Sequence, residues 1–512
     1  MLAKVYAAAV QGIDALPITV EVSCGKGCAF HLVGLPDSAV RESTPRIRTV
    51  LHESGFIMPT GNVVINMAPA DVRKEGASYD LPITIGLLCA SGQMQSNHLG
   101  DFMMMGELSL DGTLQPLRGA LPISIMAREL GYKGLIVPRQ NAREAAVVDR
   151  LEVYGVSSLL EATEFLQGKR AIEPTVVHTR EEFYSHQSDV DLDFAEVKGQ
   201  ENVKRALEVA AAGGHNVLLV GPPGSGKSML ARRLPSILPP LSLGESLETT
   251  RVHSVAGLVG PEGGLIYRRP FRSPHHTISV SAMTGGGSYP QPGEISLAHH
   301  GILFLDELPE FARPVLEVLR QPLEDRVVTI SRVQQSVTYP ASFTLVASMN
   351  PCPCGYYTHP TRPCTCAPGQ VQRYLHRISG PLLDRIDIQV EVMPVSFERM
   401  SAAPSGESSE VIRQRVIRAR EVQQRRYAGE RDVYCNAQMT SRLLGVHARL
   451  EADSLERLRT AMVRFNLSSR AYDRILKVAR TIADLEGSPQ IRASHISEAI
   501  GYRNLDRADW AG

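Results

Sequence analysis

This 512-residue sequence has few cysteines, almost no tryptophan and no net charge. It has one tryptophan and eight cysteines, and its 54 lysines and arginines are balanced by 54 aspartates and glutamates. Few cysteines, half of them clustered, favour metal binding in a reducing compartment over a disulfide framework. A net charge of zero argues neither for nor against nucleic acid. Any contact with DNA needs a local basic surface, such as one formed by assembly into a ring.

Long apolar runs are also missing. The longest apolar stretches, such as 81–90, are far too short to span a bilayer. The N-terminal residues lack the sustained apolar core of a signal peptide. We therefore expect a cytoplasmic protein without membrane contacts. With 43% hydrophobic and 21% charged residues, the chain can bury the cores of two or three domains.

Three regions separate along the chain. Residues 1–170 mix strand-like and helical segments, and the polar residues 171–192 have no clear helical period, which predicts a linker. An α/β pattern covers 193–396, and helices are expected in 397–512 after a loop rich in Ser and small residues. The clearest predicted strands are 18–24, 61–67 and 133–138, and the clearest late helices are 411–426 and 470–485.

A phosphate-binding loop follows a short apolar strand at 216–220. It has the pattern G-x-x-x-x-G-K-S and opens a helix, which is the context that the motif requires. Its backbone N–H groups can turn toward phosphate oxygens, and the helix N-terminus adds its positive dipole end. We expect Lys227 to reach the β- and γ-phosphates of ATP and Ser228 to bind Mg²⁺. The nucleotide-binding residues are Gly221, Pro222, Pro223, Gly224, Ser225, Gly226, Lys227 and Ser228.

Two acids end a second apolar strand at 301–305, and an asparagine follows a third strand at 343–348. A strand buried on both faces is a continuous apolar run. We expect Asp306 to hold Mg²⁺ through water and Glu307 to polarise the attacking water. The alternative for both is a pair of surface acids. Asn350 would orient that water beside the γ-phosphate, unless it is a simple turn residue before a proline.

Four cysteines follow Asn350 directly. Two C-x-C pairs, separated by nine residues, lie in the proline-rich segment 351–368, and they are Cys352, Cys354, Cys364 and Cys366. A loop this short has little core of its own, so a structural Cys₄ zinc site would stabilise it. The spacing departs from the usual C-x₂-C, and disulfides or free thiols are the alternatives. The metal would rigidify the loop or shape a surface that faces a pore.

Further motifs extend over 193–505: D-F-x-x-V-x-G-Q at 193–200, F-R-S-P-H-H at 271–276, P-G-E-I-S-L-A-H at 292–299 and S-G-P-L-L-D-R-I-D at 379–387. With these motifs the chain resembles the magnesium-chelatase and MCM-helicase branch of the AAA+ superfamily, and over its whole length the ComM/YifB family. The resemblance implies a homohexameric ring with ATP sites between subunits. It also implies helicase activity that promotes branch migration of DNA during natural transformation.

The resemblance assigns roles to two arginines. Arg385 matches the arginine that acts in trans on the ATP of the neighbouring subunit, where a guanidinium can stabilise charge on the γ-phosphoryl oxygens. The alternative is a salt bridge with neighbouring aspartates. Arg470 opens a C-terminal helix and matches the lid arginine that senses the nucleotide, unless it is a surface helix-cap arginine. We interpret His275 and His276 as local packing and loop hydrogen bonds rather than as metal ligands.

The N-terminal region resembles the protease domain of Lon, which has a ribosomal S5 domain 2-like α+β fold. The segments that carry the likeness are K-E-G-A-S at 74–78 and G-E-L-S-L-D-G at 106–112. Ser78 falls at the place of the nucleophile, but Leu121 takes the place of the lysine. Because a serine nucleophile without its base is inert, we expect no protease activity. Assembly or substrate guidance is the expected role.

Three basic segments are candidates for contacting DNA. The stretch 324–339 alternates like a hairpin, with Arg332 near a tip that would point into the pore, unless the hairpin is a solvated surface feature. The second candidate is Arg268 and Arg269 with Arg272. The third, the arginine-rich stretch 413–426, is more often a solvated face or a contact between subunits.

The features together predict an α/β multidomain protein with a Lon-like domain, an AAA+ core and a helical lid. It is predicted to act as a Mg²⁺- and ATP-dependent hexameric motor on single-stranded or branched DNA. One alternative is a chelatase-type motor that remodels a protein partner, which the Lon-like domain and the cysteines argue against. The others are a Lon-type peptidase and a nucleotide-gated adaptor with little turnover.

Overall fold

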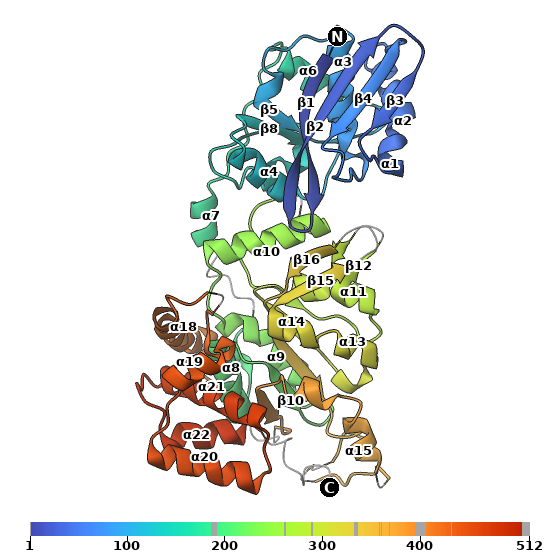
Figure 1. Cartoon of the computed structure of the whole chain (residues 1–512). Coiled ribbons are helices and arrows are strands. Elements are labelled where there is room, and N and C mark those ends of the chain that lie inside the picture. Colours follow the sequence, from blue (N-terminus) through green and yellow to red (C-terminus); the bar gives the residue numbers. More distant parts are fainter. Residues whose placement is uncertain are drawn as a thin grey trace.

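The computed structural model describes residues 2–185, 192–260, 263–287, 290–331, 336–357, 359, 361–367, 369–395, 406–431 and 433–503. The molecule is elongated (Figure 1), with a mixed α/β domain at the N-terminal end and a second α/β domain below it. Helices from the last hundred residues pack against one side of the second domain. The helix α10 (Leu243–Ala256) lies between the two α/β domains.

A seven-stranded mixed sheet forms the N-terminal domain, in the order β3-β4-β2-β1-β5-β8-β9. Three of these strands confirm the three predicted ones. The strands are β1 (Leu2–Gln11), β2 (Asp14–Gly25), β3 (Phe30–Val33), β4 (Asn62–Ala68), β5 (Phe102–Met104), β8 (Gly134–Pro138) and β9 (Glu152–Val156), with a separate hairpin of β6 (Glu107–Leu108) and β7 (Leu114–Gln115). The helices are α1 (Ser38–Arg41), α2 (Ser43–Glu53), α3 (Asp80–Ala90), α4 (Ala120–Glu129), α5 (Arg139–Ala145) and α6 (Leu159–Leu166).

Helix α3 is the centre of this domain, and all of its residues are buried. Its sequence is apolar on every side, as expected of a helix that is covered all round. Gly86 lets the helix approach the sheet closely, because a Cβ there would lie 2.6 Å from a methyl carbon of Val22. Ser78 lies just before this helix, so the packing of α3 fixes its position.

The central domain is built on a five-stranded parallel sheet in the order β11-β14-β17-β10-β18. These strands are β10 (Val217–Val220), β11 (Phe271–Arg272), β14 (Ile302–Leu305), β17 (Thr344–Met349) and β18 (Ile388–Glu391). Two hairpins, β12 (Gly285–Gly286) with β13 (Gln291–Pro292) and β15 (Val327–Ser331) with β16 (Ser336–Pro340), accompany it. The helices are α8 (Glu201–Gly213), α9 (Lys227–Ile237), α10, α11 (Val280–Thr284), α12 (Glu294–Leu297), α13 (Arg313–Glu317), α14 (Arg320–Asp325), α15 (Gln370–Leu375) and α16 (Gly380–Leu383).

The C-terminal region is helical, as predicted. Apolar residues of α18 and α21 share one hydrophobic core with the central sheet. The helices are α18 (Ser409–Arg426), α19 (Ser441–His447), α20 (Ala452–Arg464), α21 (Ser469–Leu485) and α22 (Ala493–Gly501).

The segment expected to be a polar linker carries a short helix, α7 (Thr179–Ser185). Its Phe183 is buried in a small cluster with Leu121 and Val147 of the N-terminal domain and Leu265 of the central domain. Two adjacent aromatic residues, Phe183 and Tyr184, in an otherwise polar segment give no helical period, which explains why the sequence did not predict the helix. The cluster also explains Leu121, which contributes to the contact between the two domains.

Polar contacts reinforce the same boundary. The buried Glu144 of α5 accepts hydrogen bonds from the backbone N–H of Leu121 and from the hydroxyl of Ser254 on α10. Arg251, also on α10, donates to the carbonyl of Ile13 and pairs with Asp14 at the tip of the β1–β2 hairpin. Helix α10 is therefore bound to the N-terminal domain at several points along its length.

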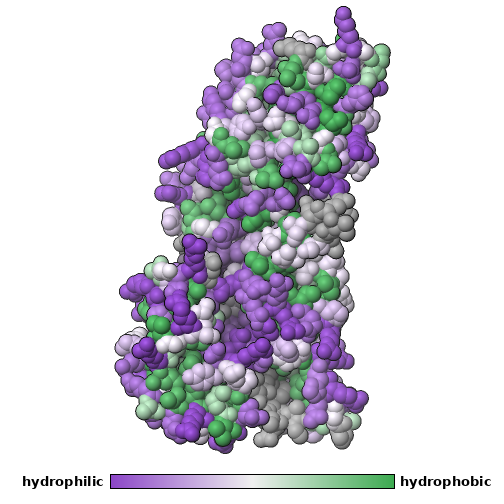
Figure 2. Space-filling model, in the orientation of Figure 1, coloured by the Kyte–Doolittle hydropathy of each residue, from purple (hydrophilic) through white to green (hydrophobic). Residues whose placement is uncertain are grey.

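The visible face of the molecule is mostly hydrophilic (Figure 2), and its hydrophobic residues lie in small separate groups. Among the described helices, none combines the length and apolar character needed to cross a bilayer.

The cluster around Phe183 leads to a stability prediction. Leu121→Ala removes a side chain with no exposed surface, and such truncations cost about 2–5 kcal/mol. A thermal melt should show the midpoint of the first transition lowered by roughly 4 °C or more. The matched control is Leu130→Ala. Leu130 is half-exposed and directly follows α4, the helix that contains Leu121, so this variant should leave the midpoint unchanged. Equal shifts for both variants would contradict the importance of this cluster.

Candidate active site

Three strands of the central sheet end at the same edge. Parallel pairing aligns Val220 with Met349 and Leu305 with Ala347, so the segments that follow β10, β14 and β17 start side by side. The carboxyl edge of a parallel sheet is where ligands bind in open α/β folds. The phosphate-binding loop follows β10, the acidic pair follows β14, and Asn350 follows β17, so the structure brings all three predicted motifs together.

Lys227 is the first residue of α9 and lies under the loop. Its Nζ donates to the carbonyl oxygens of Gly221 (2.7 Å) and Pro222 (2.9 Å) and to Oδ1 of Asn350 (3.2 Å). Burial lowers the pKa of Lys227, and the carboxylates of Asp306 and Glu307 oppose that shift. The N-terminus of α9 and the loop amides can therefore receive a phosphate group beside a positioned ammonium.

Asp306 is held by two hydroxyl groups. The hydroxyl of Ser228 donates to its Oδ2 at 2.7 Å, and the hydroxyl of Ser348 donates to its Oδ1. Ser348 was not identified from the sequence, although a polar residue inside an apolar strand is a signal that could have found it. A hydroxyl and a carboxylate in contact are oxygen ligands of the type that Mg²⁺ uses beside phosphates, so these residues fit the predicted magnesium site.

Glu307 has a left-handed backbone, with φ of 56° and ψ of 50°. Such a conformation costs about 1–3 kcal/mol for a residue other than glycine and is concentrated at active sites. Its carboxylate is largely exposed and lies 3.8 Å from Nδ1 of His276, whose ring also contacts that of His275. The histidine pair is therefore packed locally, as expected, and in addition it borders the predicted catalytic acid.

Arg385 is almost fully buried within its own chain. Its guanidinium pairs with Glu324 of α14 and donates to the carbonyl of Pro381 at 2.6 Å. Its Nε is buried without a hydrogen-bond partner among the described residues. An intramolecular salt bridge is therefore present, but the partner is Glu324 rather than a neighbouring aspartate.

Arg470 lies in the first turn of α21 and is mostly exposed. One guanidinium nitrogen is 3.3 Å from Oδ2 of Asp384, which directly precedes Arg385 in the chain. The C-terminal helices are thus connected to the segment that carries Arg385. Arg474, one turn later, pairs with the buried Asp387, so two arginines of the same helix contact this segment.

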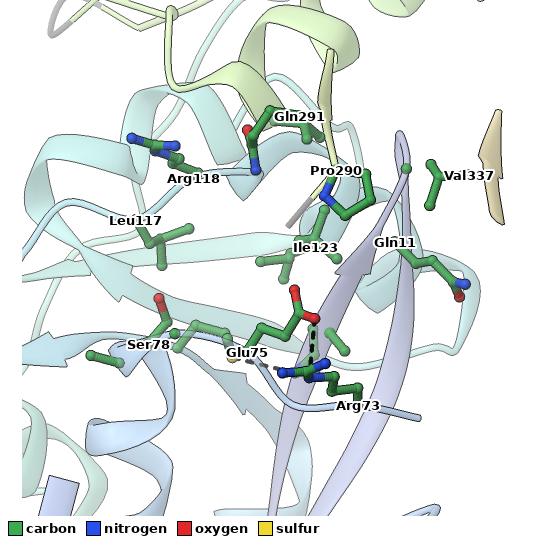
Figure 3. A pocket seen from close by; sticks show the side chains of 18 of the residues that line it. Gln11, Arg73, Glu75, Ser78, Leu117, Arg118, Ile123, Pro290, Gln291 and Val337 are labelled. Carbon is green, nitrogen blue, oxygen red and sulfur yellow. Dashed lines mark hydrogen bonds and ion pairs between the residues drawn. The ribbon is translucent and has the colours of Figure 1, made fainter. Parts of the chain in front are cut away.

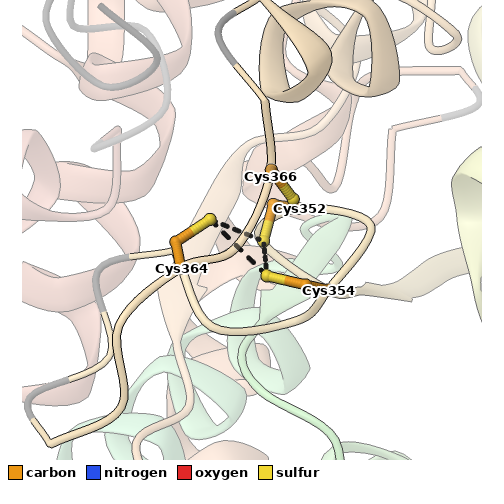
Figure 4. A group of neighbouring side chains, drawn as sticks. All are labelled: Cys352, Cys354, Cys364 and Cys366. Atoms are coloured by element: carbon orange, nitrogen blue, oxygen red, sulfur yellow. Dashed lines mark hydrogen bonds between the residues drawn. The ribbon is translucent and has the colours of Figure 1, made fainter.

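The four cysteines converge on one point (Figure 4), where their sulfur atoms lie within 4.8 Å of one another. Sγ of Cys352 is 3.3 Å from that of Cys354 and 3.7 Å from that of Cys364, and Cys354 and Cys364 are 3.5 Å apart. Tetrahedral zinc with bonds of about 2.3 Å needs sulfur atoms about 3.8 Å apart. The cluster therefore fits a zinc ion despite the unusual C-x-C spacing.

The environment of Cys354 favours the thiolate that a metal requires. Burial opposes ionisation, but hydrogen bonds from the backbone N–H groups of Tyr356 and Thr365 and from neighbouring thiols outweigh it and lower the pKa to about 5. Metal ligation by cysteine uses the thiolate form. The backbone amides of the loop thus favour the ionised form of one of the clustered thiols, while burial raises the pKa of Cys352 and Cys366.

A second group of potential ligands, Glu248, His299 and His300, lies between α10 and the start of β14. Nδ1 of His299 accepts a hydrogen bond from the backbone N–H of Ser342, so in the neutral ring Nε2 carries the proton and faces Glu248 at 3.4 Å. Because that nitrogen carries a hydrogen atom, it donates a hydrogen bond and offers no lone pair to a metal ion. The arrangement is a hydrogen-bonded contact between α10 and β14 rather than a metal site.

Ser78 lines a cavity of about 350 Å³ between the two α/β domains (Figure 3). Glu75, which is paired with Arg73, lies on one side of the cavity, and Arg118 and Gln291 lie on another. None of the described residues that line the cavity is a lysine. The serine therefore has no amine base in this cavity, and the residue at the position of the lysine, Leu121, packs elsewhere.

Several arginines considered for DNA contacts are engaged inside the chain. Arg269 donates to Glu245 and to the carbonyl of His300, and Arg272 forms a two-point pair with Glu294. In the arginine-rich helix α18, Arg415, Arg420 and Arg426 contact other parts of the chain. The hairpin of β15 and β16 is present as predicted, but Arg332 lies outside the described residues.

Comparisons with known proteins agree with this geometry. Residues 193–400 match the magnesium chelatase subunit ChlI family, residues 19–141 match the family described as subunit ChlI of Mg-chelatase, and residues 406–503 match the C-terminal part of the ChlI subunit. The competence protein ComM of Haemophilus influenzae is 43% identical over 99% of this chain and 98% of its own length. The protein YifB of Salmonella typhimurium is 44% identical over 99% of this chain and 98% of its own length. A Lon protease of Mycoplasma mycoides is 28% identical over 30% of this chain and 21% of its own length.

The sheet, the phosphate-binding loop and the acidic pair, together with these matches, define an AAA+ ATPase of the magnesium-chelatase type. Since two relatives share more than 40% of its residues over almost their full lengths, the chain belongs to the ComM/YifB family of magnesium-chelatase-like proteins.

The thiol cluster leads to a prediction about metal content. The purified protein should contain about one zinc ion per chain, because four convergent thiols form a closed structural site. Elemental analysis measures this directly. Cys364→Ser should lose the metal, whereas Cys89→Ser, at a buried cysteine in α3, should retain it. Metal-free wild-type protein, purified without chelators, would contradict the assignment.

Proposed function

We propose that this protein is a Mg²⁺- and ATP-dependent motor that acts on single-stranded or branched DNA as a homohexameric ring. The observation that carries the proposal is the assembly at one sheet edge of Lys227, Ser228, Asp306, Glu307 and Asn350. Full-length similarity to a competence protein supports DNA as the substrate. By analogy with the family, the reaction is branch migration during recombination and natural transformation.

Each residue at this edge of the central sheet would have its own role in ATP hydrolysis. The loop amides and Lys227 would bind the phosphates and stabilise the charge that develops on them. Ser228 and Asp306 would hold Mg²⁺, which neutralises phosphate charge when it is bound. Glu307 would orient the attacking water and accept its proton, and Asn350 would hold that water in line. Arg470 would report the nucleotide state to the lid helices.

The role of Arg385 requires a second subunit. In the isolated chain its guanidinium pairs with Glu324, which is largely exposed, and one N–H lacks a partner among the described residues. An arginine held this way can exchange a carboxylate for a phosphate of a neighbouring active site. We propose that ring assembly brings this exchange about, so that hydrolysis occurs only between subunits.

The remaining parts would serve the motor. The hairpin of β15 and β16 would contact DNA phosphates in the pore through Arg332, largely without sequence preference. The N-terminal domain, with its Lon-like sequence, would serve without protease activity, and its contacts with α10 fit a role in assembly or guidance of the substrate. Zinc would fix the cysteine loop at the ATP site.

The proposed function predicts ATP hydrolysis that DNA accelerates. Turnover should rise on addition of single-stranded DNA or a four-way junction, and the junction should be converted to duplex products only with ATP. Glu307→Gln should retain ATP binding but lose about 100-fold or more in turnover, because it removes the base. Glu310→Gln, at a nearby exposed acid that pairs with Arg377, is the matched control.

Two outcomes would overturn parts of this proposal. Undiminished turnover in Glu307→Gln would remove the catalytic assignment. Steady ATP hydrolysis that ignores DNA would keep the ATPase but favour the alternative, a chelatase-type motor that remodels a protein partner.

Action in trans predicts complementation between two inactive variants. Arg385→Ala and Glu307→Gln should each be nearly inactive alone, since every site lacks one group. Mixed rings contain interfaces with Glu307 from one variant and Arg385 from the other, so mixing should restore a measurable part of ATP hydrolysis. Mixing that restores no activity, with ring assembly verified by light scattering, would show that Arg385 does not act across the interface.

A further inference from the structure

The cysteine loop lies directly against the phosphate-binding loop. Gly355 follows Cys354 and has a φ of 83°. A Cβ added to it would be 2.5 Å from Cδ and 2.9 Å from Cγ of Pro223. Cβ atoms essentially never approach other heavy atoms this closely, so only glycine fits between the thiol cluster and the loop.

The two loops also meet around a small pocket that is open to solvent. It has a volume of about 10 Å³ and lies where Gly221 and Pro222 face Pro351 and Tyr357. The backbone N–H of Tyr357 also donates to Sγ of Cys352 at 3.3 Å. A displacement of the cysteine loop would be passed to the phosphate-binding loop through the close contact between Gly355 and Pro223.

Hydrogen bonds connect the same segments at their other end. The backbone N–H of Gly221 donates to the carbonyl of Met349, and Lys227 donates to Asn350. The chain then passes through Pro351 to the buried Cys352. The phosphate-binding loop is thus held by the end of β17 at one point and by Gly355 at another, and the cysteine cluster lies between them.

We propose that the four-cysteine cluster regulates the nucleotide site. When the four thiols are held together, the cluster supports the phosphate-binding loop through the contact between Gly355 and Pro223. Binding of a metal ion by the thiols would fix Cys354, and with it Gly355 and the loop that it supports. Nucleotide affinity should then depend on metal occupancy. This inference rests on the proposed ATP site, and it concerns binding and not the chemical step.

The test measures the affinity of a fluorescent ADP analogue in excess Mg²⁺, with zinc content determined on the same samples. Gly355→Ala should retain zinc and bind the nucleotide about tenfold more weakly, the expected scale of an overpacked contact. Gly369→Ala is the matched control. Its φ is 73° and it directly follows the cysteine segment, but nothing is within 4 Å of the added methyl group, so the affinity of this variant should stay within about twofold.

A double variant identifies the contact itself. Pro223→Ala removes the ring atoms that the new methyl group would meet. In that background, Gly355→Ala should cause little further loss of affinity, because coupling between contacting residues is revealed as non-additivity. Cys364→Ser breaks the cluster without changing Gly355 or Pro223. This variant should lose both zinc and nucleotide affinity.

The results of these variants distinguish a failure of the inference from a failure of the proposed ATP site. Unchanged affinity in Gly355→Ala, or equal losses in Gly355→Ala and Gly369→Ala, would overturn the support through Pro223. Unchanged affinity in zinc-free Cys364→Ser would overturn the dependence on metal. A Lys227→Ala variant that binds nucleotide as well as the wild type would instead overturn the ATP site itself.

Discussion

The parallel pairing of β17 between β10 and β14 is the contact on which the rest of the site depends. Since the three strands run in the same direction, the segments that follow them emerge together, and residues 123 positions apart in the chain, Lys227 and Asn350, come within 3.2 Å. A register shift of one residue would turn side chains to the opposite face of the sheet. The side chains of these strands are buried on both faces, so the edge that carries the site is anchored in the core of the domain.

Helix α10 connects this sheet to the rest of the molecule. It contacts the N-terminal domain through Arg251 and Ser254, and it reaches the start of β14 through Glu248 and the neighbouring histidines. Hydrogen bonds to His299 and His300 hold the pKa of Glu248 far below its ordinary value. The strand that carries the acidic pair is thus bound at its beginning to the element that also holds the N-terminal domain.

Buried charge explains why two of the candidate basic residues are unavailable for DNA. Arg269 and Arg272 are both paired with glutamates inside the central domain. Removing one partner of a buried pair leaves an uncompensated charge and is strongly destabilising, so these arginines are part of the fold. A protein with no net charge that binds DNA must use the arginines that remain at its surface after such pairs are formed.

Local patterns determined much of this protein. The phosphate-binding loop, the acidic pair, Asn350 and the clustered cysteines were recognisable because each motif combines a chemical residue type with a short apolar run or a fixed spacing. The same runs predicted three of the five strands of the central sheet, β10, β14 and β17, and the sequence also predicted the hairpin of β15 and β16 and the long C-terminal helices α18 and α21.

Tertiary structure decided the features that depend on partners distant in sequence. The pairing of Arg385 with Glu324, the hydroxyl of Ser348 on Asp306, the packing of Phe183 against Leu121 and the contact of Gly355 with Pro223 have no sequence period or motif. Each arises only when separate segments are brought to one place, since burial and steric fit act on atoms that are close in space and not on residues that are close along the chain.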